Sequence, residues 1–190
     1  MTLFEYLSVA VSIVLGLAAA RLLDALPHVL AKDRRYWVHA TITCVCLANL
    51  GNSWWALWSL HAVSEWTSTW FFLVLGISGL HYTIAALLSS SAASNVGSWW
   101  EHYWEIRTRL YSLAIFWMAL ISLQNWILFD VSWRHPTRLV ELGGIVLYVA
   151  GAVSANPRVH AVIAISMAMA LAVIIFGIYA SPAPLAPGAG

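Results

Sequence analysis

Seven polar or amphipathic side chains interrupt the long apolar runs of this 190-residue chain, and they are the residues best suited to chemistry. A charged or amide side chain in hydrocarbon is costly unless it faces other protein groups or a cavity. Carboxylates and amides exchange hydrogen bonds, and indole faces attract cations. A group of such side chains at one depth in the membrane could therefore bind an amphipathic or cationic small molecule. The candidate ligand-binding residues are Glu5, Asn49, Asn52, Trp55, Gln124, Asn125 and Glu141.

The same residues have a second interpretation, because amides commonly tie membrane helices together and Trp gathers at the membrane interfaces. Along the first apolar segment, Glu5, Ser8, Ser12 and Gly16 follow three- and four-residue steps and share one helix face. Small residues allow close approach, so this face predicts a helix-packing seam. The alternative is a polar groove with Glu5 at its mouth. The sequence does not say whether the polar faces converge.

Histidines suggest a b-type haem as a less favoured alternative, and the candidate ligands are His39, His81 and His160. A bis-histidine haem needs two of them on facing helices at matched depth. The chain has no C-x-x-C-H motif, and His102 with Glu105 would supply only two metal ligands. We therefore expect neither a metal nor a cofactor.

The elements that position these side chains follow from composition. Hydrophobic residues make up 62% of the chain and charged residues 9%, against about 25% charged in soluble domains. So few charges exclude a cytosolic globular enzyme and a disordered chain, and a net charge of +1 excludes a nucleic-acid partner. The composition predicts an all-α, polytopic membrane bundle.

About 20 apolar residues are needed for one crossing. The apolar segments predict six transmembrane helices with short loops, at 3–26, 37–60, 66–88, 110–129, 139–155 and 159–180. Pro27 is expected to end the first. Ser98 and Glu101 fit a capping box, so a helix should begin there and continue into the fourth span. Residues 1–180 then form one domain, followed by a flexible Pro/Gly/Ala-rich tail at 181–190.

Positive charges predict the orientation, because Lys and Arg collect on the cytoplasmic side. With the N-terminus outside, seven of the nine Lys and Arg residues lie inside, and Arg134 and Arg138 lie outside. We therefore expect a bacterial inner membrane protein with periplasmic N- and C-termini.

Three short stretches carry a resemblance. Residues 4–17 read F-E-Y-L-S-V-A-V-S-I-V-L-G-L, Y-W-V-H begins at Tyr36, and W-W-A-L-W begins at Trp54. They resemble a group of uncharacterised small bacterial multi-pass membrane proteins that begin F-E-Y-x-S-V-x-x-S-I-x-L-G-L. The resemblance covers the first third of the chain and transfers no activity.

Three functions are consistent with these features. The leading one is non-enzymatic binding or passage of a small amphipathic molecule through an outer-leaflet pocket lined by Trp and amides. The second is an accessory or structural subunit, whose partners would be the lipid bilayer and another membrane protein or a second copy. The third is a small b-haem or quinone redox protein. The chain has no P-loop and no G-x-S-x-G motif, and its single lysine, Lys32, lies in a loop, so we lean against an enzyme.

Overall fold

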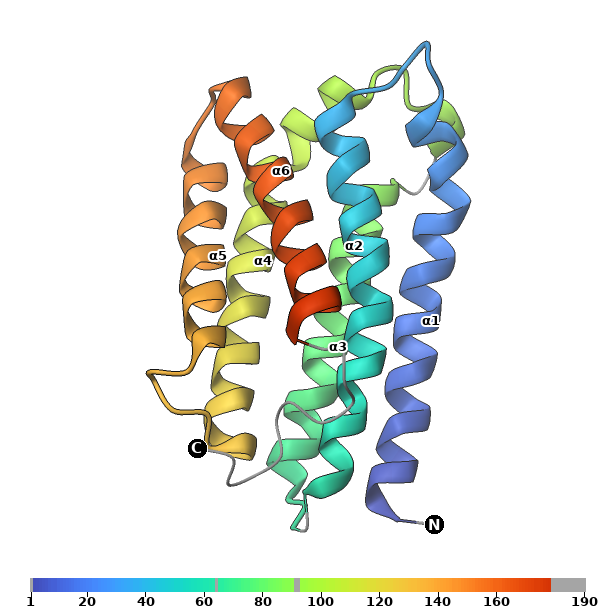
Figure 1. Ribbon diagram of the computed structural model, residues 1–190. Coiled ribbons are helices and arrows are strands. Elements are labelled where there is room, and N and C mark those ends of the chain that lie inside the picture. The colour runs from blue at the N-terminus through green and yellow to red at the C-terminus, as the bar shows by residue number, and fades with distance from the viewer. Residues whose placement is uncertain (1, 64, 91–92, 179–190) are drawn as a thin grey trace.

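The computed structural model describes residues 2–63, 65–90 and 93–178, and this part of the chain contains helices and no strand (Figure 1). The six long helices run alternately up and down. We call the end at which the first helix starts the lower end, as drawn in Figure 1, and the other the upper end. The helices are α1 (Leu3–Leu30), α2 (Trp37–Ala56), α3 (Ser68–Ser89), α4 (Trp99–Phe129), α5 (Pro136–Val153) and α6 (Pro157–Val173), with short turns η1 (Leu57–Ala62), η2 (Ala93–Asn95) and η3 (Ile174–Ile178).

Within the described residues, five helices are long and apolar enough to cross a membrane: α1, α3, α4, α5 and α6 with η3. α2 is not among them, although it has 20 residues and no Asp, Glu, Lys or Arg. Polar residues such as His39, Asn49 and Asn52 lower its hydropathy. The chain is thus an all-α bundle of multi-pass membrane type, with five rather than six helices that qualify by composition.

Five of the six long helices begin at a residue whose side chain accepts a hydrogen bond from the first turn, and α2 is the exception. α4 begins at Trp99, where the Ser98 side chain accepts a hydrogen bond from the Glu101 amide, so the predicted long fourth helix is confirmed. The predicted end of the first helix at Pro27 is wrong, because α1 continues to Leu30. Proline removes one backbone donor, and a helix can lose one hydrogen bond in its last turn. The α-helix of the second span ends at Ala56, and η1 replaces its predicted last turn.

The packing face of α1 differs from the predicted one. Its buried residues follow steps of three and four: Leu7, Val11, Leu15, Ala18, Leu22, Ala25 and Val29. Gly16 is exposed, and a Cβ built there would meet nothing within 4 Å, so Gly16 marks no close helix approach. The expected seam is therefore wrong at Glu5 and Gly16, which are exposed, and an apolar stripe forms the core of the contact. Ser12 does contact α2, because its Oγ accepts a hydrogen bond from Trp54 Nε1 at 3.0 Å.

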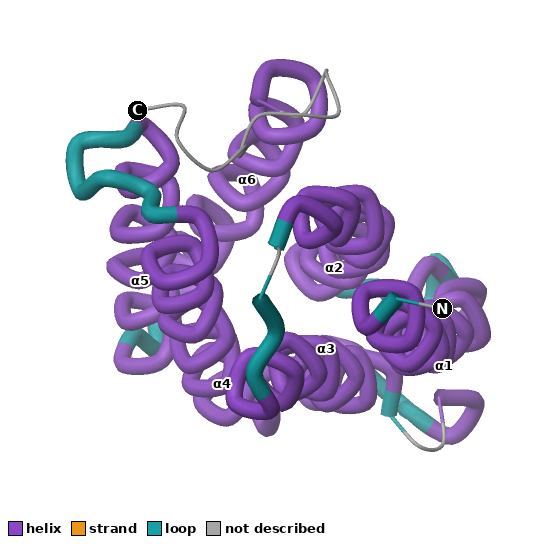
Figure 2. The backbone as a smooth tube through the Cα atoms, turned by 90° about the horizontal axis from the view of Figure 1, so that it is seen from below, coloured by secondary structure: helices purple, strands orange, loops and turns teal. Residues whose placement is uncertain are grey.

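Figure 2 shows the arrangement of the helices from the lower end of the bundle. α1 packs on α2 and α3, α4 packs on α3 and α5, and α6 packs on α2 and α5. α6 therefore joins the α1–α2–α3 side of the bundle to the α4–α5 side. The last two residues of the predicted sixth span and the predicted tail at 181–190 lie outside the described residues.

Candidate functional site

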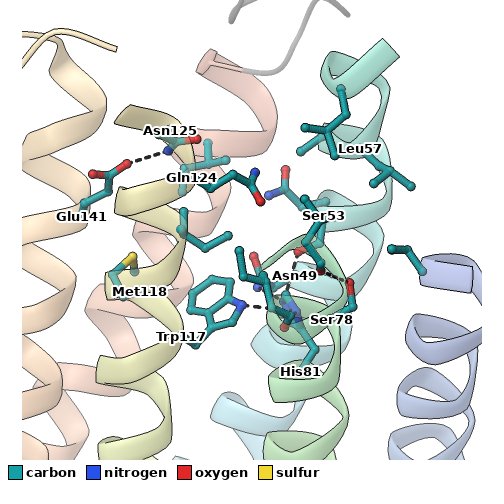
Figure 3. A pocket seen from close by; sticks show the side chains of 18 of the residues that line it. Asn49, Ser53, Leu57, Ser78, His81, Trp117, Met118, Gln124, Asn125 and Glu141 are labelled. Atoms are coloured by element: carbon teal, nitrogen blue, oxygen red, sulfur yellow. Dashed lines mark hydrogen bonds between the residues drawn. The ribbon is translucent and has the colours of Figure 1, made fainter. Parts of the chain in front are cut away.

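A cavity of about 170 Å³ lies in the lower half of the bundle and is lined by residues of α1 to α5, η1 and η3 (Figure 3). We call it the polar cavity. Five of the seven candidate ligand-binding residues line it: Asn49, Asn52, Gln124, Asn125 and Glu141. They come from α2, α4 and α5, so the structure brings together polar groups that are up to 92 positions apart in the sequence.

The other two candidates do not line this cavity. Glu5 is exposed and belongs to the N-terminal cap of α1, where its Oε2 accepts a hydrogen bond from the Thr2 amide at 2.8 Å. Trp55 is exposed on α2, between the cavity residues Ser53 and Ala56, and does not line the cavity. Trp55 is separated from the amides by its rotation about the axis of α2. Glu5 is separated from them along the chain, because the α1 residues that line the cavity are Val11 and Leu15, more than one turn further into the helix.

His81 of α3 is the centre of the polar groups at the base of the cavity (Figure 3). Trp117 Nε1 of α4 lies 3.2 Å from His81 Nδ1, and an indole nitrogen can only donate. The Ile77 carbonyl, which can only accept, also lies 3.2 Å from Nδ1, so these two contacts belong to different tautomers of the ring. On the other side of the ring, Ser53 Oγ lies 3.1 Å from Nε2 and can donate or accept, and Asn49 Nδ2, which can only donate, lies 3.3 Å from the same nitrogen. α2, α3 and α4 thus meet at one neutral imidazole.

Two amides of the cavity lining are uncommitted. Asn52 and Gln124 are half-buried, and neither side chain has a hydrogen-bond partner among the described residues. In Figure 3 the Gln124 side chain extends from α4 toward Ser53 on α2. A half-buried amide without a protein partner is satisfied by water or by a bound polar group. These two side chains are therefore the ones free to bind a ligand.

Glu141 is, by contrast, already neutralised. Arg138 Nη1 lies 2.7 Å from its Oε2, and the exposed fractions of the two residues are 2% and 5%. Ser122 Oγ donates to Oε2 and Asn125 Nδ2 to Oε1, each at 2.7 Å. Burying a charge pair requires such additional hydrogen bonds. The wall at Glu141 therefore presents no net charge to the cavity.

A second cavity of about 280 Å³ adjoins the first toward the middle of the bundle. We call it the apolar cavity, because most of its lining comes from aliphatic and aromatic side chains of α2 to α6. Six residues line both cavities: Asn49, His81, Trp117, Met118, Val140 and Ile174. The two volumes together fall within the range of about 300–1,000 Å³ that is typical of small-molecule sites.

A hydrogen-bonded cluster closes the apolar cavity toward the upper end. His160 Nε2 lies 3.0 Å from the Ser154 carbonyl and donates to it, which leaves Nδ1 as an acceptor. Tyr103 Oη lies 2.7 Å from that Nδ1, and the hydroxyls of Tyr103 and Tyr111 are 2.9 Å apart. Tyr103 and His160 are fully buried, so the chain of bonds forms a plug between α4 and α6.

The sequence analysis missed this cluster, although a signal for it exists. Tyr103, Arg107 and Tyr111 are four residues apart and share one face of α4. Arg107 Nη1 donates to the Ser154 carbonyl at 2.7 Å and to the Ala152 carbonyl at 3.1 Å. A cation at a helix C-terminus is favourable, so Arg107 ties α4 to the end of α5.

The three haem candidates are engaged by protein groups. His39 Nε2 lies 3.1 Å from the Leu88 carbonyl, and its ring stacks on Trp99. The Tyr103 ring contacts both His39 and His160, with centroid distances of 6.2 and 5.5 Å. In the part of the chain that the structure describes, no three His, Cys, Asp or Glu side chains are grouped to hold a metal ion.

Comparison with known proteins found no matching family model, no matching curated protein and no matching solved structure.

Proposed function

We propose that this membrane protein binds a small, neutral amphipathic molecule in the two joined cavities. The uncommitted amides of Asn52 and Gln124 carry the proposal, because they line a polar cavity that shares six lining residues with an apolar one. The polar head of the molecule bonds to these amides and to the groups around His81. Its apolar body occupies the space between α2 and α4 to α6.

Charge argues for a neutral ligand rather than the cation that indole and carboxylate groups first suggested. Arg138 compensates Glu141, and the His81 ring has a nitrogen that accepts from Trp117 Nε1 in one tautomer or from Asn49 Nδ2 in the other, so it is neutral in both. A cation would enter this low-dielectric space without a free counter-charge, which is costly. A neutral head group with hydrogen-bonding oxygens loses less on desolvation and matches the amides.

Binding rather than passage is the function we favour. The upper boundary of the apolar cavity is formed by the fully buried Leu88 and by Leu110 and Tyr111, which are 3% and 1% exposed. A molecule that entered from the lower end would therefore stop at this boundary. The protein would act by holding its ligand, not by an enzymatic reaction.

The membrane arrangement that goes with this function has six spans. We infer that α2 crosses the bilayer with the other helices, because it has no charged side chain and packs lengthwise on α1 and α6. Its polar residues Asn49, Asn52 and Ser53 line the polar cavity. The lower end then faces the periplasm of a bacterial inner membrane, and lipid covers the apolar surface.

The test uses 1-octanol as the probe and the rise of the unfolding temperature as the readout, because a ligand that binds only the folded state stabilises it. We expect concentration-dependent stabilisation of the purified protein in detergent. Gln124→Leu should keep the unfolding temperature of the ligand-free protein and weaken the response to 1-octanol by about three- to tenfold in concentration, the effect of one lost hydrogen bond.

The matched control is Leu123→Ala, one residue away on an exposed face of α4. It should respond to 1-octanol as the unaltered protein does, since a non-specific effect of the alcohol on the micelle would act equally on all variants. Equal responses of Gln124→Leu and Leu123→Ala would contradict the proposed site.

A further inference from the structure

The deep end of the apolar cavity contains a polar group that nothing in the protein uses. Tyr148 of α5 lines this cavity and is 8% exposed. Its hydroxyl has no hydrogen-bond partner among the described residues. The hydroxyl oxygen is not completely enclosed by protein atoms, so it borders open space. A buried hydroxyl without a partner is costly, and native proteins usually satisfy such groups.

Its neighbours explain why this hydroxyl is left over. The Tyr111 ring lies 6.2 Å from the Tyr148 ring, but the Tyr111 hydroxyl is committed to Tyr103 in the upper plug. The plug has a fixed direction, because His160 Nε2 donates to the Ser154 carbonyl and Tyr103 then donates to His160 Nδ1. Tyr111 in turn donates to Tyr103. Tyr148 is outside this chain of bonds.

We propose that Tyr148 is the second anchor of the bound molecule, which therefore carries a hydrogen-bonding oxygen at each end of an apolar body. This inference rests on the proposed function and narrows the ligand class from a neutral amphipath to a two-headed one. One head bonds to Asn52, Gln124 and the groups around His81. The other bonds to the Tyr148 hydroxyl at the deep end.

Ser166 of α6 is the residue that could replace Tyr148 in this role. It also lines the apolar cavity, and its hydroxyl has no partner among the described residues. Ser166 is only half-buried, however, and a serine hydroxyl in a helix can turn to a carbonyl of its own preceding turn. Tyr148 has no such local alternative, because its hydroxyl lies at the end of a rigid ring.

The experiment compares diols with monoalcohols of the same chain length: 1,6-hexanediol, 1,8-octanediol and 1,10-decanediol against 1-hexanol, 1-octanol and 1-decanol. Apparent affinities come from ligand-dependent unfolding temperatures in one detergent. The unaltered protein should prefer one diol over its monoalcohol. Tyr148→Phe, which keeps the ring and removes only the hydroxyl, should reduce this preference by about three- to tenfold. Ser166→Ala should retain it.

Each outcome separates the two claims. If monoalcohols bind and no diol is preferred, or if Tyr148→Phe keeps the preference for a diol, the proposal that Tyr148 binds a second head group is wrong. The proposed function is unaffected by either result. If Ser166→Ala alone abolishes the preference, Ser166 is the anchor and the assignment to Tyr148 fails. If no probe stabilises the unaltered protein, the proposed function itself fails. Tyr148→Phe should fold with an unchanged unfolding temperature, and a large loss would show that the hydroxyl has a structural partner instead.

Discussion

Gly151 of α5 lies directly against the ring of Tyr111 on α4: a Cβ added to this glycine would be 2.6 Å from two ring carbons. The ring cannot move aside easily, because Tyr111 is 1% exposed and its hydroxyl is bonded to Tyr103. The absence of a side chain at residue 151 therefore allows α4 and α5 to approach closely enough to close the cavity at its upper end.

Gly151→Ala should destabilise the protein by about 1–3 kcal/mol, the usual effect of overpacking. Thermal or denaturant unfolding in detergent measures it. Gly143→Ala in the same helix is the matched control, because a Cβ there meets nothing within 4 Å. The control should be neutral or slightly stabilising, since alanine is the better helix former. Equal effects of the two substitutions would show that the contact with Tyr111 is unimportant.

Removal of one partner of the buried ion pair should be severe. Glu141→Gln keeps the shape of the side chain but leaves the Arg138 guanidinium buried without its counter-charge, at a cost of about 3–5 kcal/mol. The free energy of unfolding should fall accordingly. The exposed pair of Glu105 and Arg109 provides the control, because exposed pairs contribute about 0–1 kcal/mol. A Glu141→Gln variant as stable as Glu105→Gln would refute the structural role of the pair.

Tyr103→Phe should weaken the upper plug. The substitution removes the hydroxyl that bridges Tyr111 and His160, and the loss of a buried hydrogen-bond partner costs about 1–3 kcal/mol. Tyr111 lies 3.4 Å from His160 Nδ1 and could recover part of this loss. Tyr6→Phe is the control, because Tyr6 is exposed on α1. If both variants unfold at the temperature of the unaltered protein, the hydroxyl network does not stabilise the bundle.

Membrane topology can be tested with reporters. A reporter fused after Gly190 should be periplasmic, and one inserted between Lys32 and Arg35 should be cytoplasmic, because seven of the nine Lys and Arg residues lie on that side. Alkaline phosphatase and a fluorescent protein distinguish the two compartments. A cytoplasmic signal after Gly190 would mean either that the bundle is inverted or that one helix does not cross the bilayer. That helix would be α2, which does not qualify as a span by composition.

The fold class, the number of long helices and the depth of each residue along the bundle could be predicted from the sequence. These properties depend on composition and on the number of residues along the chain. Apolar length marks the helices, Ser98 marks the start of α4, and a rise of about 1.5 Å per residue converts position into depth. The candidate amides Asn49, Asn52, Gln124 and Asn125 accordingly lie at one level and line one cavity.

Rotation about each helix axis was decided only by the tertiary structure. In a soluble helix an apolar stripe reveals the buried face, but lipid is as apolar as the protein interior, so the stripe disappears in a membrane. Consecutive residues differ by about 100° on a helix with 3.6 residues per turn, so Ser53 lines the polar cavity and Trp55 does not. For the same reason the sequence does not show that His81 faces the polar cavity or that Tyr148 faces the apolar one, because contacts between helices determine the rotation of each helix.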